Sequence, residues 1–297
     1  MIAAILDTLG LAARTMAKDP EVALVYRIFG PDGRDETDDL RNRLRTALRN
    51  LEIAPGAGQL RVCAEGDSWI NILWPWSSAF GYEKTFFDVI EGDSAYYTRS
   101  VGYPGDTLAD MLAARDYRQL LASGTFDCFI FSGGGNDVLG GAALSRLLRD
   151  RPATGAAATP AGCIDPAALA AAVSDLAKGY DFIARDVTAA DPDVKMLVHG
   201  YDYPRPVAGE PWLGVPFAAR GYDLVADKDL IEAILMHLVD AFYDMLATIA
   251  ASHAHVEVVD LRTIVAGRWN DELHPKETAS LDLAAEFTRR MPTAPVA

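Results

Sequence analysis

The sequence predicts an α/β protein in which helices cover both faces of a five-stranded parallel sheet. Two observations predict this fold. Five short apolar segments typical of strands recur along the chain, at 60–65, 94–102, 126–132, 194–200 and 255–261. Amphipathic helical segments lie between the later ones, at 165–187 and 228–250. Near-continuous apolar strands that alternate with such helices are typical of parallel sheets buried on both faces.

The first 58 residues have a different pattern and predict a separate helical extension. Within 39–54 the leucines recur at helical spacing with charged residues on the opposite side, and they form one stripe: Leu40, Leu44, Leu48 and Leu51. Acidic residues at the start of this segment suit the N-terminus of a helix. The sequence PGAGQ at 55–59 ends the pattern. We therefore predict a helical extension over 1–58 and an α/β domain over 59–297.

The composition of the chain narrows the classes of binding partner and the possible cellular locations. The formal net charge is −15 with no cluster of Lys and Arg, which disfavours nucleic acids and anionic membranes. No apolar run approaches the ~18 residues of a membrane span. The N-terminus lacks the basic start of a signal peptide, and the three cysteines have no C-x-x-C spacing. These features predict a cytoplasmic protein without a membrane span.

The first predicted strand is followed by Gly66-Asp67-Ser68. A serine at this position can begin a helix with its hydroxyl exposed and its backbone N–H free, although capping serines are common. A second Gly-Asp-Ser sequence ends at Ser94, only 11 residues before Gly105. That distance is too short for a helix and a strand, whereas the 37 residues between Ser68 and Gly105 suit a βαβ crossover. The spacing favours Ser68 as the reactive serine.

Glycine turns follow the next two predicted strands. Gly105 allows a ligand to approach the backbone closely, although an ordinary strand-to-helix turn has the same sequence. Gly133-Gly134-Gly135 precede Asn136 and complete no phosphate-binding motif, and the following Asp137 would repel phosphate. The Asn136 amide is instead suited to donating a hydrogen bond to an oxyanion.

Asp271 and His274 lie three residues apart after the last predicted strand. A carboxylate at this spacing can bind the imidazole, fix its tautomer and leave the other ring nitrogen free to act as a base. The other histidines have no such neighbour and form no metal-binding set. The sequence therefore predicts a serine, histidine and aspartate site without a metal.

In their order along the chain, these motifs resemble those of the SGNH (GDSL-like) hydrolase family. The resemblance covers about residues 60–290 and implies a flavodoxin-like three-layer sandwich, with 59–297 as the hydrolase domain. It implies a serine esterase in which Ser68 attacks the ester, His274 is the base and Asp271 orients His274. The N–H groups of Ser68 and Gly105 and the amide of Asn136 would form the oxyanion hole. No cofactor is implied.

Aromatic residues near the predicted site indicate the class of substrate. Those that could line an apolar cleft are Trp69, Trp74, Trp212 and Phe217, although such residues also pack in cores. They favour an acyl or lipid-like ester as the small-molecule substrate. A carbohydrate O-acetylesterase or a thioesterase on the same fold is the alternative, and a non-enzymatic binding module would be expected to lack one of the catalytic positions.

The segment 201–227 follows the fourth predicted strand and is rich in proline, glycine and aromatic residues. Because ligands bind beyond the carboxyl ends of parallel strands, this segment should lie over the site. Its length exceeds that of ordinary connections, so we expect a mobile cover, with a rigid surface excursion as the alternative.

Overall fold

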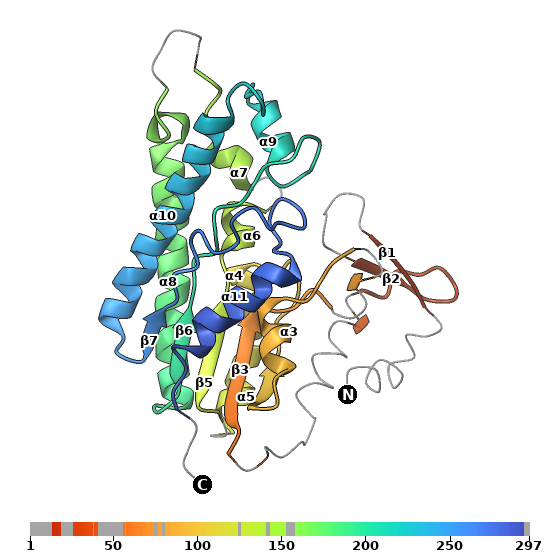
Figure 1. Cartoon of the computed structure of the whole chain (residues 1–297), viewed down its shortest axis with the longest axis vertical. Coiled ribbons are helices and arrows are strands. Elements are labelled where there is room, and N and C mark those ends of the chain that lie inside the picture. Colours follow the sequence, from red (N-terminus) through yellow and green to blue (C-terminus); the bar gives the residue numbers. More distant parts are fainter. Residues whose placement is uncertain are drawn as a thin grey trace.

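The predicted five-stranded parallel sheet is confirmed by the computed structural model shown in Figure 1. The structure describes residues 14–18, 26–37, 39–40, 56, 58–73, 77–78, 81–123, 126–140, 143–152 and 158–293. The strands are β3 (Leu60–Gly66), β4 (Tyr96–Ser100), β5 (Cys128–Ser132), β6 (Lys195–Val198) and β7 (Val256–Val258). Each lies within one of the five apolar segments or extends one residue beyond it.

The strands lie side by side in the order β4-β3-β5-β6-β7, and all four neighbouring pairs are parallel. This is the doubly wound order of flavodoxin-like proteins. The chain leaves β3 toward one edge of the sheet and leaves β5 toward the other edge. In such sheets the ligand crevice opens between these two strands, at their carboxyl ends.

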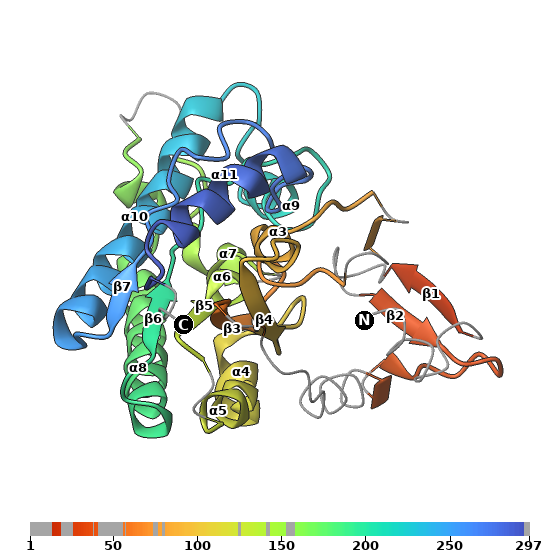
Figure 2. The same cartoon turned by 60° about the horizontal axis from the view of Figure 1, so that its bottom comes forward.

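Helices cover both faces of the sheet (Figure 2). On one face, α3 (Phe86–Glu91) and α11 (Glu277–Thr288) pack against each other. On the other face, α8 (Pro166–Ala190) packs against α4 (Leu108–Ala114) and α5 (Asp116–Leu121). A further long helix, α10 (Lys228–Ser252), packs against α8 and β7. This double cover explains why the central strands β3 and β5 are buried on both sides.

The local sequence sets where several of these helices begin. Thr85 and Thr107 cap α3 and α4, and in each case an aspartate three residues later completes a capping box. Asp165 caps α8 by accepting two backbone N–H groups, and Pro166 occupies its first position. Because these caps fix where the helices start, they also determine where the loops at the carboxyl edge of the sheet end.

A second apolar cluster lies beyond the carboxyl edge of the sheet. It combines the first half of α10 with the short helices α7 (Ala143–Leu147), α9 (Gly214–Ala219) and η3 (Ala161–Cys163). By length and composition α10 could cross a membrane, but half of its most apolar window is buried within the protein. Soluble core helices pass the same test, and α10 contributes to both apolar clusters.

The N-terminal prediction is wrong in part. Residues Thr15–Lys18 (β1) and Tyr26–Phe29 (β2) form a separate antiparallel sheet where helix was predicted. The leucine pattern that predicts helix lies at 39–54 and does not include these residues, whereas Tyr26, Ile28 and Phe29 have high strand propensity. Asp39 and Leu40 are helical, but 41–55, which hold most of the predicted leucine stripe, lie outside the described residues. The domain boundary at 58 stays a prediction.

Candidate active site

Ser68 lies on the turn that follows β3. Gly66 ends this strand so close to β5 that a Cβ atom there would lie 2.4 Å from the carbonyl oxygen of Ser132, and no larger residue fits. The N–H of Asp67 donates to the same carbonyl at 3.1 Å. The strand pairing therefore holds the backbone on the N-terminal side of Ser68 at the predicted crevice.

The segment after Ser68 forms a single turn rather than the predicted helix. The N–H groups of Ile70 and Asn71 both donate to the carbonyl of Asp67. The Asn71 side chain then accepts the N–H of Leu73 at 2.7 Å, and Leu73 has a positive φ of 61°. Asparagine side chains compete with helices in this way, and the left-handed residue turns the chain away.

The three residues of the predicted triad are brought together although they come from distant parts of the chain. Ser68 Oγ lies 2.8 Å from Nε2 of His274. Nδ1 of His274 lies 2.9 Å from each carboxylate oxygen of Asp271. Ser68 is 6% exposed and His274 is 4% exposed, so these contacts are largely shielded from bulk water.

Asp271 is also held by its own backbone. Its Oδ1 accepts the N–H groups of Leu273 and His274, each at 2.8 Å. Burial raises the pKa of Asp271, but attraction to His274 and these hydrogen bonds outweigh burial and lower the pKa to about 2. Asp271 is therefore a carboxylate at neutral pH, able to stabilise a positive charge on His274.

Hydrogen-bond donors lie beside Ser68. Within the described part of the chain, the backbone N–H groups of Ser68 and Gly105 donate to no other group. Gly105 has φ +85°, a conformation that favours glycine. Asn136, on α6 (Gly135–Val138), donates one amide hydrogen to the carbonyl of Asp106 at 2.8 Å, which leaves its second hydrogen available.

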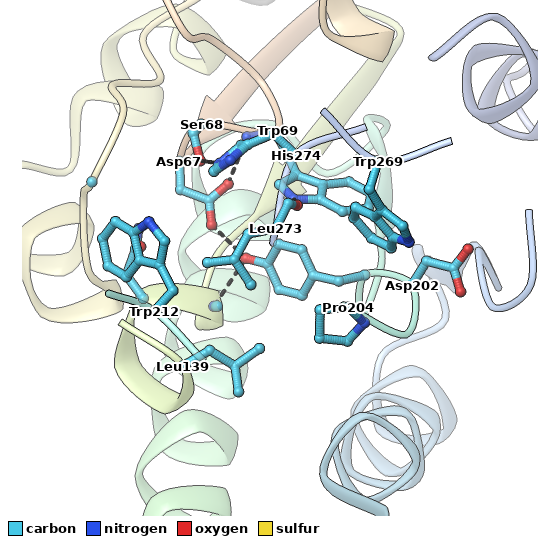
Figure 3. A pocket seen from close by; sticks show the side chains of 14 residues that line it. Asp67, Ser68, Trp69, Leu139, Asp202, Pro204, Trp212, Trp269, Leu273 and His274 are labelled. Carbon is cyan, nitrogen blue, oxygen red and sulfur yellow. Dashed lines mark hydrogen bonds between the residues drawn. The ribbon is translucent and has the colours of Figure 1, made fainter. Parts of the chain in front are cut away.

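These groups share one cavity (Figure 3). Of the residues predicted from the sequence, six line it: Ser68, Trp69, Gly105, Asn136, Trp212 and His274. Phe217 does not, because it is fully buried in the second apolar cluster and packs on Tyr222. Trp74 lies outside the described residues. Trp69 is largely structural, since it packs on Tyr201 and donates to the carbonyl of Leu273.

The second Gly-Asp-Ser serine and the other histidines lie outside this cavity. Ser94 is exposed on the turn before β4, away from this cavity. His199 is fully buried, which lowers its pKa to about 3, and His253 binds Asp181 at 2.9 Å. Among the described residues, no group of three or more His, Cys, Asp or Glu side chains could hold a metal ion.

Solved structures with the same fold are known. No protein-family model and no curated protein matches the sequence. An extracellular lipase from Streptomyces rimosus matches with a TM-score of 0.50 and 18% identity, over 77% of this chain and 99% of the lipase. A phospholipase A1 from Streptomyces albidoflavus NA297 gives the same score and identity, over 78% and 99%. The chain has the fold of the SGNH hydrolases.

In this SGNH fold, Tyr201 and Asp67 form a buried pair that the sequence analysis missed. The Tyr201 hydroxyl donates to Asp67 Oδ2 at 2.5 Å and accepts the N–H of Gly135 at 3.0 Å. Asp67 also accepts hydrogen bonds from Ser132 and from the N–H of Trp69. Burial raises the pKa of Asp67, although these hydrogen bonds oppose the rise. The sequence feature that could have revealed this pair is a tyrosine directly after the fourth predicted strand, 194–200.

Glu272 is a second missed residue, although it directly follows Asp271. Its side chain is 0% exposed, and its carboxylate accepts four backbone N–H groups at 2.7–3.0 Å, those of Val207, Trp212, Leu213 and Gly214. Burial raises its pKa, and the four hydrogen bonds oppose the rise. Four residues of the segment 201–227 line the cavity, as expected: Tyr201, Asp202, Pro204 and Trp212. The bonds to Glu272 anchor this segment to the loop that carries His274.

Proposed function

We propose that the protein is a serine esterase that hydrolyses carboxylic esters through an acyl-enzyme. The observation that carries the proposal is the continuous contact from Ser68 Oγ to His274 Nε2 and from His274 Nδ1 to Asp271, at 2.8 and 2.9 Å. A nucleophile, a base and a group that orients the base are the requirements for acyl transfer to a serine.

In the proposed first step, Ser68 Oγ attacks the ester carbonyl while its proton passes to His274 Nε2. The C–O bond to the alcohol then breaks, and the alcohol takes the proton from His274. Water attacks the acyl-enzyme in the same way, releasing the acid and restoring the Ser68 hydroxyl. Asp271 stays ionised throughout and stabilises the positive imidazolium.

The proposed oxyanion hole consists of the N–H of Ser68, the N–H of Gly105 and the free amide hydrogen of Asn136. Support comes from these two backbone donors, which have no acceptor among the described residues, and from the bond that holds the Asn136 amide to Asp106. Donors fixed before the reaction stabilise the developing negative charge at little reorganisation cost.

For the substrate, we propose a small ester with an acyl or lipid-like group. Support comes from Trp212, Leu139 and Leu273, which give the cavity an apolar wall. A sugar acetate or a thioester would use the same chemistry, and a binding module would not need the serine–histidine contact.

The test is hydrolysis of a panel of p-nitrophenyl esters of increasing acyl length, acetylated sugars and an acyl thioester. We expect Ser68→Ala to lower kcat by several orders of magnitude, about 10⁴-fold or more. The matched control is Ser94→Ala, which should keep wild-type activity. A fluorophosphonate should label Ser68 in the wild-type protein. Labelling of Ser94 in place of Ser68, or turnover by Ser68→Ala at the wild-type rate, would refute the proposal.

A further inference from the structure

We propose that the indole N–H of Trp212 binds an oxygen atom of the substrate other than the ester oxygens, and so makes Trp212 a specificity-determining residue. The inference rests on the proposed esterase activity. It predicts a preference for esters that carry an ether, hydroxyl or second carbonyl oxygen near the scissile bond over esters with plain alkyl groups.

The first observation is that Trp212 has a buried donor without an acceptor. The residue is 5% exposed, and no group in the described part of the chain accepts a hydrogen bond from its Nε1. Trp69, in the same cavity, shows the usual arrangement, since its Nε1 donates to the carbonyl of Leu273 at 3.1 Å. Buried N–H groups without a partner are rare because they cost free energy, so an acceptor from a ligand would be favoured.

The second observation is the position of this donor. Trp212 lines the cavity together with Ser68, Gly105 and Asn136. In Figure 3 the indole nitrogen lies on the edge of the ring that faces toward Asp67 and Ser68. A substrate ester bound at Ser68 would therefore have its neighbouring atoms near Trp212.

The third observation is that Trp212 is held in place. Its backbone N–H donates to Glu272 Oε2 at 3.0 Å, and the next two N–H groups also donate to Glu272. At Gly214 a Cβ atom would lie 1.9 Å from the carbonyl oxygen of Val207, so the turn requires glycine. Because Glu272 directly follows Asp271, the backbone that carries the indole is fixed relative to His274 before a substrate binds, which lowers the ordering cost of binding.

The surroundings of the donor explain the predicted selectivity. The neighbouring cavity wall is apolar, with Leu139, Pro204 and Leu273. An alkyl group would fill this space but leave the N–H of Trp212 unpaired. An oxygen at the matching position would satisfy the donor, and sites that hold a fixed donor discriminate against ligands that lack the acceptor.

The experiment compares matched pairs of esters that differ by one oxygen. For the acyl side the pair is p-nitrophenyl methoxyacetate and p-nitrophenyl butanoate. For the alcohol side it is 2-methoxyethyl acetate and butyl acetate. The measured quantity is the ratio of kcat/KM within each pair, compared between wild type and variant so that the intrinsic reactivity of the esters cancels.

Two variants remove the donor. Trp212→Phe removes the N–H and part of the ring, and replacement of Trp212 by β-(3-benzothienyl)alanine removes the N–H while keeping the ring size. We expect both to lower the oxygen-to-alkyl ratio in one pair by about five- to tenfold, the effect of one hydrogen bond. The control is Tyr203→Phe, because the Tyr203 hydroxyl bonds to Asp240 outside this cavity, and it should leave both ratios unchanged.

The outcomes separate this inference from the proposed function. If the wild-type protein hydrolyses these esters but both ratios stay within about twofold in the benzothienyl variant, Trp212 is not a substrate donor. If the wild-type protein hydrolyses none of the four esters nor the esters of the wider panel, the proposed function fails and this inference fails with it.

Discussion

The hydroxyl of Tyr201 donates a 2.5 Å hydrogen bond to Oδ2 of Asp67, the residue that precedes Ser68. Because this hydroxyl also accepts the N–H of Gly135, it joins the turn of the proposed nucleophile to the helix that carries Asn136. We expect Tyr201→Phe to lower kcat about tenfold with a small change in KM, since both halves of the site lose their common support.

Steady-state kinetics on a p-nitrophenyl ester measure this effect. Tyr203→Phe is the matched control, because the Tyr203 hydroxyl bonds to Asp240 at 2.8 Å outside the cavity. Equal losses of kcat in the two variants would show that the Tyr201–Asp67 bond has no special role in the site.

Asn136→Ala should lower kcat by roughly 10²–10³ while KM changes little, because the proposed donor acts mainly on the transition state. The variant also loses the bond to Asp106, so circular dichroism and the melting temperature should be recorded beside the kinetics. A large increase in KM with unchanged kcat would instead identify Asn136 as a ground-state binding residue.

Asp271→Asn should lower kcat by about 10⁴ at neutral pH, because an amide cannot stabilise the imidazolium and selects the wrong tautomer of His274. Since the pKa of Asp271 is lowered to about 2, the native carboxylate is ionised at every pH above about 4. The loss should therefore be present across the range from about pH 5 to pH 8. A variant that regains native kcat anywhere in this range would contradict the proposed role.

Glu272→Ala should destabilise the protein by about 3 kcal/mol or more, because four buried backbone N–H groups lose their acceptor. The control is Glu232→Ala. The Glu232 side chain on α10 is 45% exposed and lies 3.7 Å from Lys228, so its removal should change the free energy of unfolding by less than about 1 kcal/mol. Urea unfolding curves of both variants test the difference, and equal midpoints would exclude an anchoring role for Glu272.

The stability contribution of Asp88 should decrease with rising pH. Burial raises its pKa to about 6, although hydrogen bonds from Thr85 oppose the rise. A carboxyl whose pKa is higher in the folded protein stabilises the fold below its unfolded pKa, and this contribution is lost as pH rises through about 6. Relative to Asp88→Asn, wild type should thus lose stability between about pH 4 and pH 7. A difference in unfolding free energy that does not change with pH would contradict this.

The sequence predicts the sheet because its central strands β3 and β5 are buried on both faces. Segments such as 126–132 are then apolar at nearly every position, and no polar alternation obscures them. The site residues follow for a related reason, since Ser68 and Asn136 come shortly after β3 and β5, and His274 lies on the longer loop after β7, at the same edge of the sheet. Their positions depend on strand ends, which a local pattern can reveal.

Contacts between irregular segments could not be predicted in this way. The partners of Glu272 lie about sixty residues away in a loop without periodicity, and no local rule relates the two. The sequence places Phe217 at the cleft because its segment follows the fourth predicted strand, but the short helix α9 carries Phe217 and packs its side chain into the second apolar cluster. At β1 and β2 the helical prediction extends the leucine pattern of 39–54 to residues that do not have it.

The separation of Ser68 and His274 along the chain has a consequence during synthesis. The two residues are 206 positions apart, and the proposed base follows the last strand of the sheet. At about 5–20 residues per second, the ribosome adds His274 roughly 10–40 s after Ser68. Throughout that interval the emerging chain contains Ser68 without the proposed base, so the proposed esterase activity requires that the edge strand β7 and the loop after it have docked.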